Sequence, residues 1–158
     1  MLVVSNTSPI CYLVLIGEID LLPKLFRAIL IPTLVRDELR HPEAPEAVQQ
    51  WIANPPSWLS IHATPQIPNE QLDRLHSGER AAIVLAEQEE ADLLILDEMA
   101  ARMLATQRGH RITGLIGILD EAASRNHVDL PRAIERLAQT NFRASPRLLK
   151  ALLDLHRS

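Results

Sequence analysis

The chain has 158 residues, of which 47% are hydrophobic and 23% charged, a balance typical of one globular domain with a sizeable core. Aromatic residues make up only 3%, which argues against a base-stacking platform of the RNA-recognition or OB type. The single Cys11 excludes an internal disulfide, and residues 1–16 lack the length of a membrane span and the positive start of a signal peptide. We therefore expect residues 1–158 to form one domain of a cytoplasmic protein without a membrane partner.

Charge is unevenly distributed along the chain. The net charge is −4, but residues 1–98 carry 6 basic and 15 acidic side chains, whereas residues 99–158 carry 10 and 5. An acidic half and a basic half in one domain are compatible with a cation site beside a phosphate-binding face. Solvated helix surfaces of uneven charge explain the same distribution equally well.

Short apolar strands alternate with helices in the N-terminal part of the chain. Residues 2–5 are uncharged and rich in β-branched side chains, which predicts a first strand. A helix is expected to begin at Pro9, with Ser8 as its N-cap, and to end before Gly17. The elements expected next are a helix at 19–26, a strand at 28–31 and a helix at 32–39.

The middle of the chain is expected to be irregular, because residues 42–68 hold six of the eleven prolines. A strong apolar helix then precedes the most hydrophobic strand, and a glycine at 109 ends the helix after that strand. The expected elements are helices at 45–53, 68–76, 79–89, 99–108, 115–126, 131–140 and 146–156, and strands at 58–62 (an edge strand), 92–96 and 111–113. This alternation predicts an α/β domain with a mostly parallel sheet between helices.

The strand at 92–96 is the element around which the site is expected to form. Its uninterrupted apolar run is typical of a strand buried on both faces of a parallel sheet. It ends in Asp97 and Glu98, and ligands bind beyond the carboxyl ends of strands in such sheets. The structural alternative is that Asp97 only caps the following helix.

Two other polar residues fall at equivalent places in the pattern. Asn6 follows the first strand, and Glu79 lies in the first turn of a helix, where the helix dipole also favours an acid for structural reasons. Glu38 cannot be placed by periodicity, and an exposed helix charge is its simplest interpretation. If these oxygens converge, they form a site for Mg²⁺ or Mn²⁺, which prefer oxygen ligands.

Other chemistries have no support in the sequence. The chain has no glycine-rich phosphate loop and no Gly-x-Ser-x-Gly motif, and its six histidines lack zinc-type spacing. A divalent ion in an oxygen site typically activates water and neutralises charge on a phosphate during phosphodiester cleavage. Candidates for contacts to an RNA backbone are Arg102, Arg108, Arg111 and Arg125, in the basic half, although such arginines are more often solvated helix residues.

Six short blocks carry a resemblance to a known family. They are, in chain order, Val3–Ile10, the helix after Ile31-Pro32 that ends in Asp37-Glu38-Leu39, Leu75–Glu79, Leu94–Glu98, Ile112-Thr113-Gly114 and Asn141–Pro146. Together they resemble the PIN-like family of small prokaryotic proteins related to VapC-type toxins. The similarity covers nearly the whole chain.

The resemblance implies a PIN-like, Rossmann-like fold of three layers and a Mg²⁺- or Mn²⁺-dependent endoribonuclease acting as the toxin of a type II toxin–antitoxin pair. Its metal-site residues would be Asn6, Glu38, Glu79 and Asp97, with Glu98 as a further ligand and Thr7 or Ser8 orienting a ligand or water. RNA would be the substrate. The partners implied are a cognate antitoxin and, by analogy, a second copy of the chain.

Asn6 departs from the pattern of the family, which has an aspartate at this position. An amide oxygen still coordinates Mg²⁺, but the site then carries one negative charge less. The sequence therefore leaves two functions open: an attenuated ribonuclease, or a non-catalytic PIN-like module that binds RNA or a protein and regulates without cleavage. A nuclease acting on DNA is a third alternative.

Overall fold

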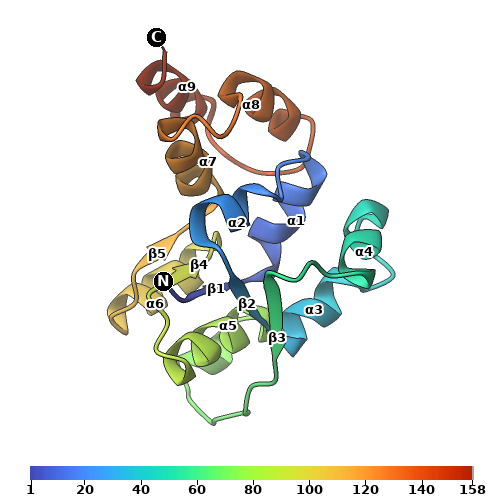
Figure 1. Ribbon diagram of the computed structural model, residues 1–158. Coiled ribbons are helices and arrows are strands. Elements are labelled where there is room, and N and C mark those ends of the chain that lie inside the picture. The colour runs from blue at the N-terminus through green and yellow to red at the C-terminus, as the bar shows by residue number, and fades with distance from the viewer. Residues whose placement is uncertain (158) are drawn as a thin grey trace.

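The computed structural model describes residues 1–157 and is built around a five-stranded sheet (Figure 1). The strands lie in the order β3-β2-β1-β4-β5, and every neighbouring pair is parallel. Their bounds are Val3–Ser5 for β1, Ile29–Pro32 for β2, Leu59–His62 for β3, Leu93–Ile95 for β4 and Ile112–Thr113 for β5. The predicted α/β class with a mostly parallel sheet is confirmed.

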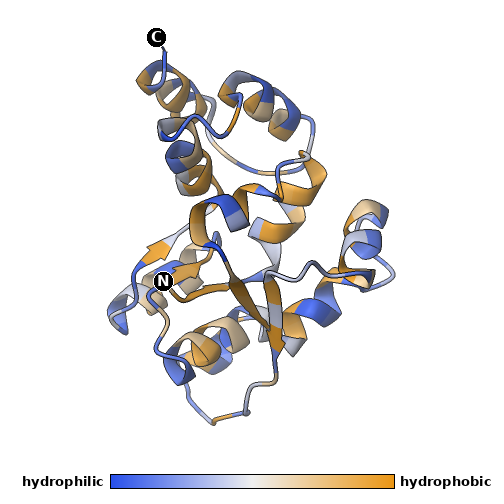
Figure 2. Ribbon diagram, viewed as in Figure 1, coloured by the Kyte–Doolittle hydropathy of each residue, from blue (hydrophilic) through white to orange (hydrophobic). Residues whose placement is uncertain are grey.

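Each inner strand sends alternate side chains into two separate hydrophobic cores. In β4, Ile95 packs into one core, whereas Leu94 and the following Leu96 pack into the other. Val3 and Val4 of β1 divide in the same way. Successive side chains of a strand point to opposite faces, so a strand that is buried on both faces must be apolar throughout. Figure 2 shows this as a hydrophobic sheet between helices that have both hydrophobic and hydrophilic faces.

The helices form a layer on each face of the sheet. Those that contribute to the hydrophobic core of Val3 and Ile95 are α1 (Thr7–Leu15), α2 (Leu21–Phe26), α3 (Thr33–Leu39), α4 (Glu46–Ala53), α7 (Leu115–Ser124), α8 (Leu130–Ala138) and α9 (Pro146–Leu155). Of these, α8 and α9 lie farther from the strands than α1 and α7 do (Figure 1). The opposite face is covered by α5 (Ser77–Gln88) and α6 (Met99–Gln107) (Figure 1). Among the helices of residues 1–157, none combines the length and apolarity needed to cross a membrane.

The start of α1 differs from the prediction by two residues. The helix begins at Thr7 with Asn6 in the N-cap position, whereas the sequence predicted Ser8 as the cap and Pro9 as the first residue. Pro9 is the third helical residue, where its missing N–H has no consequence, because the first four N–H groups of a helix lack partners within it. The proline was therefore compatible with either start, and the sequence alone did not distinguish them.

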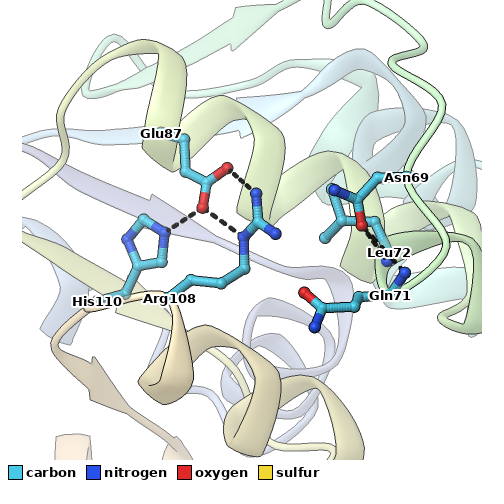
Figure 3. Close-up of polar contacts among 6 residues, drawn as sticks. All are labelled: Asn69, Gln71, Leu72, Glu87, Arg108 and His110. Carbon is cyan, nitrogen blue, oxygen red and sulfur yellow. Dashed lines mark hydrogen bonds and ion pairs between the residues drawn. The ribbon is translucent and has the colours of Figure 1, made fainter.

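The helix predicted at 68–76 is reduced to one 3₁₀ turn at Leu72–Arg74. The side chain of Asn69 accepts hydrogen bonds from the backbone N–H groups of Gln71 and Leu72, at 3.0 and 3.1 Å (Figure 3). Such local side-chain contacts compete with helix formation, as asparagine often does near the start of a turn. The segment therefore follows the surface before α5 begins.

An ion-pair cluster joins the end of α5 to the residues after α6. Glu87 accepts hydrogen bonds from Arg108 Nε at 2.6 Å and Nη2 at 2.7 Å, and its Oε2 lies 3.0 Å from His110 Nε2 (Figure 3). A two-pronged arginine–carboxylate pair is stronger than an ordinary surface pair. The cluster therefore fixes the C-terminal ends of the two helices that cover this face.

We expect Glu87→Gln to lower the free energy of unfolding by about 1 kcal/mol at neutral pH. The hydrogen bonds from Arg108 lower the pKa of Glu87 from its ordinary 4.5, so the folded state binds this proton more weakly than the unfolded chain. The cluster thus stabilises the fold above the unfolded pKa, and this stabilisation is lost as the pH falls through the lowered pKa. Urea unfolding of both proteins from neutral to acidic pH should give a difference that shrinks toward zero in acid.

Glu121→Gln is the matched control, since the Glu121–Arg125 pair is half exposed on both sides and follows ordinary i,i+4 spacing. It should change stability less than Glu87→Gln does. Equal losses in the two variants, or a Glu87 difference that is constant with pH, would contradict the stabilising role of the cluster.

Candidate functional site

The centre of the site is the crevice between β1 and β4. The chain leaves β1 toward β2 on one side of the sheet and adds β4 on the other, so the strand order reverses at this point. Ligands bind outside the carboxyl ends of the strands at such a reversal. Asn6 and Asp97 lie there, because each follows its strand by one or two residues and the backbone N–H of Asn6 donates to Ile95 O at 3.0 Å.

Asn6 and Asp97 each hold a buried oxygen without a hydrogen-bond partner among the residues of the described chain. Asn6 is 4% exposed, and its free atom is Oδ1. Asp97 Oδ1 accepts a hydrogen bond from Leu115 N at 2.9 Å, at the start of α7, and its Oδ2 is the free atom. Burial raises the pKa of Asp97, while the Leu115 hydrogen bond and the charge of Arg102 act to lower it.

Asp97 does not cap α6, which was the structural alternative for this residue. That role belongs to Glu98, whose Oε2 accepts from Ala101 N at 3.0 Å. One oxygen of Glu98 is therefore committed to its own helix. The neighbouring Asp97 is free to face the strand ends.

Glu38 and Glu79 come to the same edge of the sheet from α3 and α5. Glu38 Oε1 accepts a hydrogen bond from Thr7 Oγ1 at 3.1 Å, which ties it to the start of α1. Glu79 is 9% exposed, and burial raises its pKa, followed by the repulsive charge of Glu98. His76 acts in the opposite direction, and Glu38 adds to the rise. Glu38, Glu79 and Glu98 therefore influence one another electrostatically.

Gly78 permits the close approach of α3 to the start of α5. A Cβ at position 78 would collide with Glu38 Oε1 and would lie 3.4 Å from Asn6 Oδ1. The carboxylate of Glu38 and the amide of Asn6 thus both border the same glycine. This places Asn6, Glu38 and Glu79 around the first turn of α5.

The predicted residues share one edge of the sheet but do not form one closed ligand set. Within residues 1–157, no three His, Cys, Asp or Glu side chains are arranged as a metal-binding group. Asn6, Glu38 and Glu79 lie around the start of α5, whereas Asp97 follows the neighbouring strand β4 and is bound to the start of α7. The two free oxygens, Asn6 Oδ1 and Asp97 Oδ2, nevertheless suit a hard divalent cation, because buried polar atoms normally have partners.

Arg102 lies beside Asp97, a position that the sequence analysis did not single out among the four arginines. Its Nη1 donates to Leu96 O at 2.8 Å, and a Cβ at Gly114 would lie 2.6 Å from that nitrogen. Arg102 is the fourth residue of α6, and helical side chains lean toward the helix N-terminus. This lean is the sequence signal that could have placed it at the strand end.

The other three arginines lie at the opposite edge of the sheet. Arg108 is bound to Glu87 after the end of α6. Arg111 and Arg125 border a pocket with Met1 and Leu93, at the amino-terminal ends of the strands. These three residues are therefore remote from Asp97, because helices that begin at the carboxyl edge end at the other one.

The comparisons with known proteins give one result. A family model described as DUF3368, a PIN domain, matches residues 2–158. The comparisons with curated proteins and with solved structures gave no match. The α/β fold with its all-parallel sheet agrees with that match.

Gly78→Ala should displace Glu38 while leaving the fold intact. The new Cβ would meet the far end of a flexible, exposed side chain, which can rotate away, so stability should change by less than about 1 kcal/mol. A crystal structure should show the Thr7–Glu38 hydrogen bond broken, and thermal unfolding should be nearly unchanged. A structure in which Glu38 keeps its place and α5 shifts instead would contradict this account.

Proposed function

Because the chain belongs to the PIN domain family described as DUF3368, we propose that it is a Mg²⁺- or Mn²⁺-dependent endoribonuclease. The observation that carries the proposal is the pair of buried, unpartnered oxygens, Asn6 Oδ1 and Asp97 Oδ2, at the ends of the two central strands. An unpartnered buried oxygen destabilises a fold by about 1–3 kcal/mol, so its presence at a strand end indicates a ligand site.

The metal-binding residues in this proposal are Asn6, Glu38, Glu79 and Asp97. Asp97 Oδ2 and Asn6 Oδ1 supply the buried oxygens, and the carboxylates of Glu38 and Glu79 supply negative charge from the side of α5. A bound Mg²⁺ or Mn²⁺ would supply a water of lowered pKa and would neutralise charge on the phosphate. Glu98 is assigned a capping role first and a ligand role second, since its Oε2 is committed to Ala101 N.

The residues of the chain itself hold this arrangement in place. Leu115 N fixes one oxygen of Asp97 and leaves the other, Oδ2, buried and available for a ligand. Thr7 Oγ1 donates to Glu38 Oε1 and so holds that carboxylate, which is the orienting role expected of Thr7 or Ser8. Ser8 is exposed. The ligands are therefore oriented by fixed hydrogen bonds, which is how sites of this kind gain affinity.

We extend the proposal to a toxin of a type II toxin–antitoxin pair, acting as a homodimer. Support comes from the six blocks that resemble VapC-type toxins. The cheapest test is the neighbouring reading frame: its product should copurify with the chain and suppress RNA cleavage. Sedimentation of the purified chain would give its oligomeric state.

A non-catalytic PIN-like module, binding RNA or a protein, is the second candidate function. Asn6 favours it, because the site has one negative charge less than the aspartate of the family pattern would give. A DNA nuclease is distinguished from a ribonuclease by assaying the same protein on both substrates.

Asp97→Asn should abolish metal-dependent RNA cleavage without unfolding the domain. The replacement removes the charge of the buried carboxylate but keeps its shape and the acceptor for Leu115 N. Calorimetric titration of Mn²⁺ into the metal-stripped protein should show binding in the parent and none in the variant. Asp92→Asn, at the other end of the same strand, is the control and should bind and cleave like the parent. Cleavage by the Asp97 variant at the rate of the parent would contradict the proposal.

Asn6→Asp separates the two candidate functions. A carboxylate at this buried position restores one negative charge beside the cation, so Mn²⁺ affinity should rise at least about tenfold, or about 1.4 kcal/mol. Cleavage should rise with it if the chain is an attenuated nuclease. Asn54→Asp, at an exposed residue after α4, makes the same charge change and should have no effect. Tighter metal binding without any cleavage would favour the binding module.

A further inference from the structure

A cavity of about 360 Å³ opens beside Asp97. The residues of its wall that matter here are Asp97, Arg102, Thr113, Gly114, Gly117 and Leu148. It therefore joins the end of β4 to the starts of α6 and α7. None of the four proposed metal ligands except Asp97 borders it.

Arg102 is the one cationic side chain of this cavity and forms no ion pair within 4.0 Å in residues 1–157, although its charge acts on the neighbouring Asp97. Nη1 is anchored on Leu96 O, a neutral backbone acceptor. A guanidinium carries five N–H donors in a planar fork, so most of its donors remain uncommitted. An anchored arginine with free donors suits a phosphate, which it binds through two parallel hydrogen bonds.

An apolar groove of about 400 Å³ adjoins this cavity across Arg102. Its apolar walls are Met99, Met103 and Ile112, and the two methionines are 68% and 56% exposed. Leu148, 48% exposed, borders the cavity on the other side. A nucleotide has the matching composition, since it carries an anionic phosphate beside an aromatic base, and methionine sulfur makes favourable contacts with aromatic rings.

We propose that this groove binds one nucleotide of a single-stranded RNA, adjacent to the phosphodiester that is cleaved. Arg102 contacts the phosphate, and Met99 and Met103 pack against the base. Single strands are favoured because their unstacked bases are accessible to side chains. The proposal deepens the ribonuclease function and rests on it for the identity of the strand.

The C-terminal segment forms one wall of this nucleotide site and is held by α1. Tyr12 OH donates to Asn141 Oδ1 at 2.7 Å, and its ring meets that of Phe142 edge to face, with 5.0 Å between the centroids. These contacts fix the loop before α9, which carries Leu148. The block Asn141–Pro146 thereby gains a role in positioning the wall of the cavity beside Arg102.

The test measures RNA binding by the metal-stripped protein in EDTA. The readout is the fluorescence anisotropy of a labelled single-stranded RNA of about eight nucleotides, a length within the usual site sizes. Arg102→Gln should weaken binding at least about tenfold, the loss expected for a charge-assisted phosphate contact. It should also reduce the dependence of affinity on salt. Arg125→Gln, at the opposite edge, is the matched control and should bind like the parent.

Met103→Glu tests the groove without affecting the core, because this side chain is exposed. It should weaken RNA binding severalfold, whereas Leu155→Glu, the same change at an exposed residue of α9, should not. Unchanged affinity in both the Arg102 and Met103 variants, or no RNA binding by the parent, overturns the inference. The inference is also overturned if the groove binds a protein and its substitution leaves the RNA affinity unchanged.

Failure of the nuclease proposal would look different. Glu79→Gln should lose Mn²⁺ binding and keep its RNA affinity in EDTA, because Glu79 borders neither the cavity nor the groove. RNA binding that depends on Arg102 in a protein without metal-dependent cleavage would support the nucleotide groove and contradict the enzyme.

Discussion

The parallel pairing of β1 with β4 is the constraint on which the site depends. Ser5 pairs with Ile95, and the backbone N–H of Asn6 continues the ladder to Ile95 O. A slip of one residue would exchange the side chains of Val3 and Val4 between the two cores, so both faces of the sheet oppose it. The hydrophobic cores thereby fix where the polar residues that follow the strands will lie.

This arrangement places polar atoms where they lack partners. Asn6 Oδ1 and Asp97 Oδ2 are buried without hydrogen bonds within the described residues, and each such atom costs about 1–3 kcal/mol. The cores on both faces offset that cost. Gly78 and Gly114 leave room for the site, because a side chain at either position would occupy the space of a site carboxylate. The site therefore results from what the fold leaves unpaired and unfilled.

The order and type of most elements followed from the sequence, because buried strands and amphipathic helices have different periods. Local polar choices did not follow. Whether Asp97 or Glu98 caps α6, and whether Asn6 or Ser8 precedes α1, depends on tertiary neighbours that periodicity does not contain. The edge that Asn6 and Asp97 share followed from the parallel sheet. The place of Arg102 did not, since it depends on the lean of one side chain toward Leu96 O.

The structure brings acidic and basic residues of the two halves of the chain to the same site. Glu38 and Glu98 act electrostatically on Glu79, whereas Arg102 is the cation that acts on Asp97. The basic residues of the C-terminal half are not all gathered beside Asp97, since Arg108 is paired with Glu87 at the far edge. In the ribonuclease that we propose, acidic and basic residues next to Asp97 would have different roles. The carboxylates would hold a cation, and the guanidinium of Arg102 would orient the anionic strand.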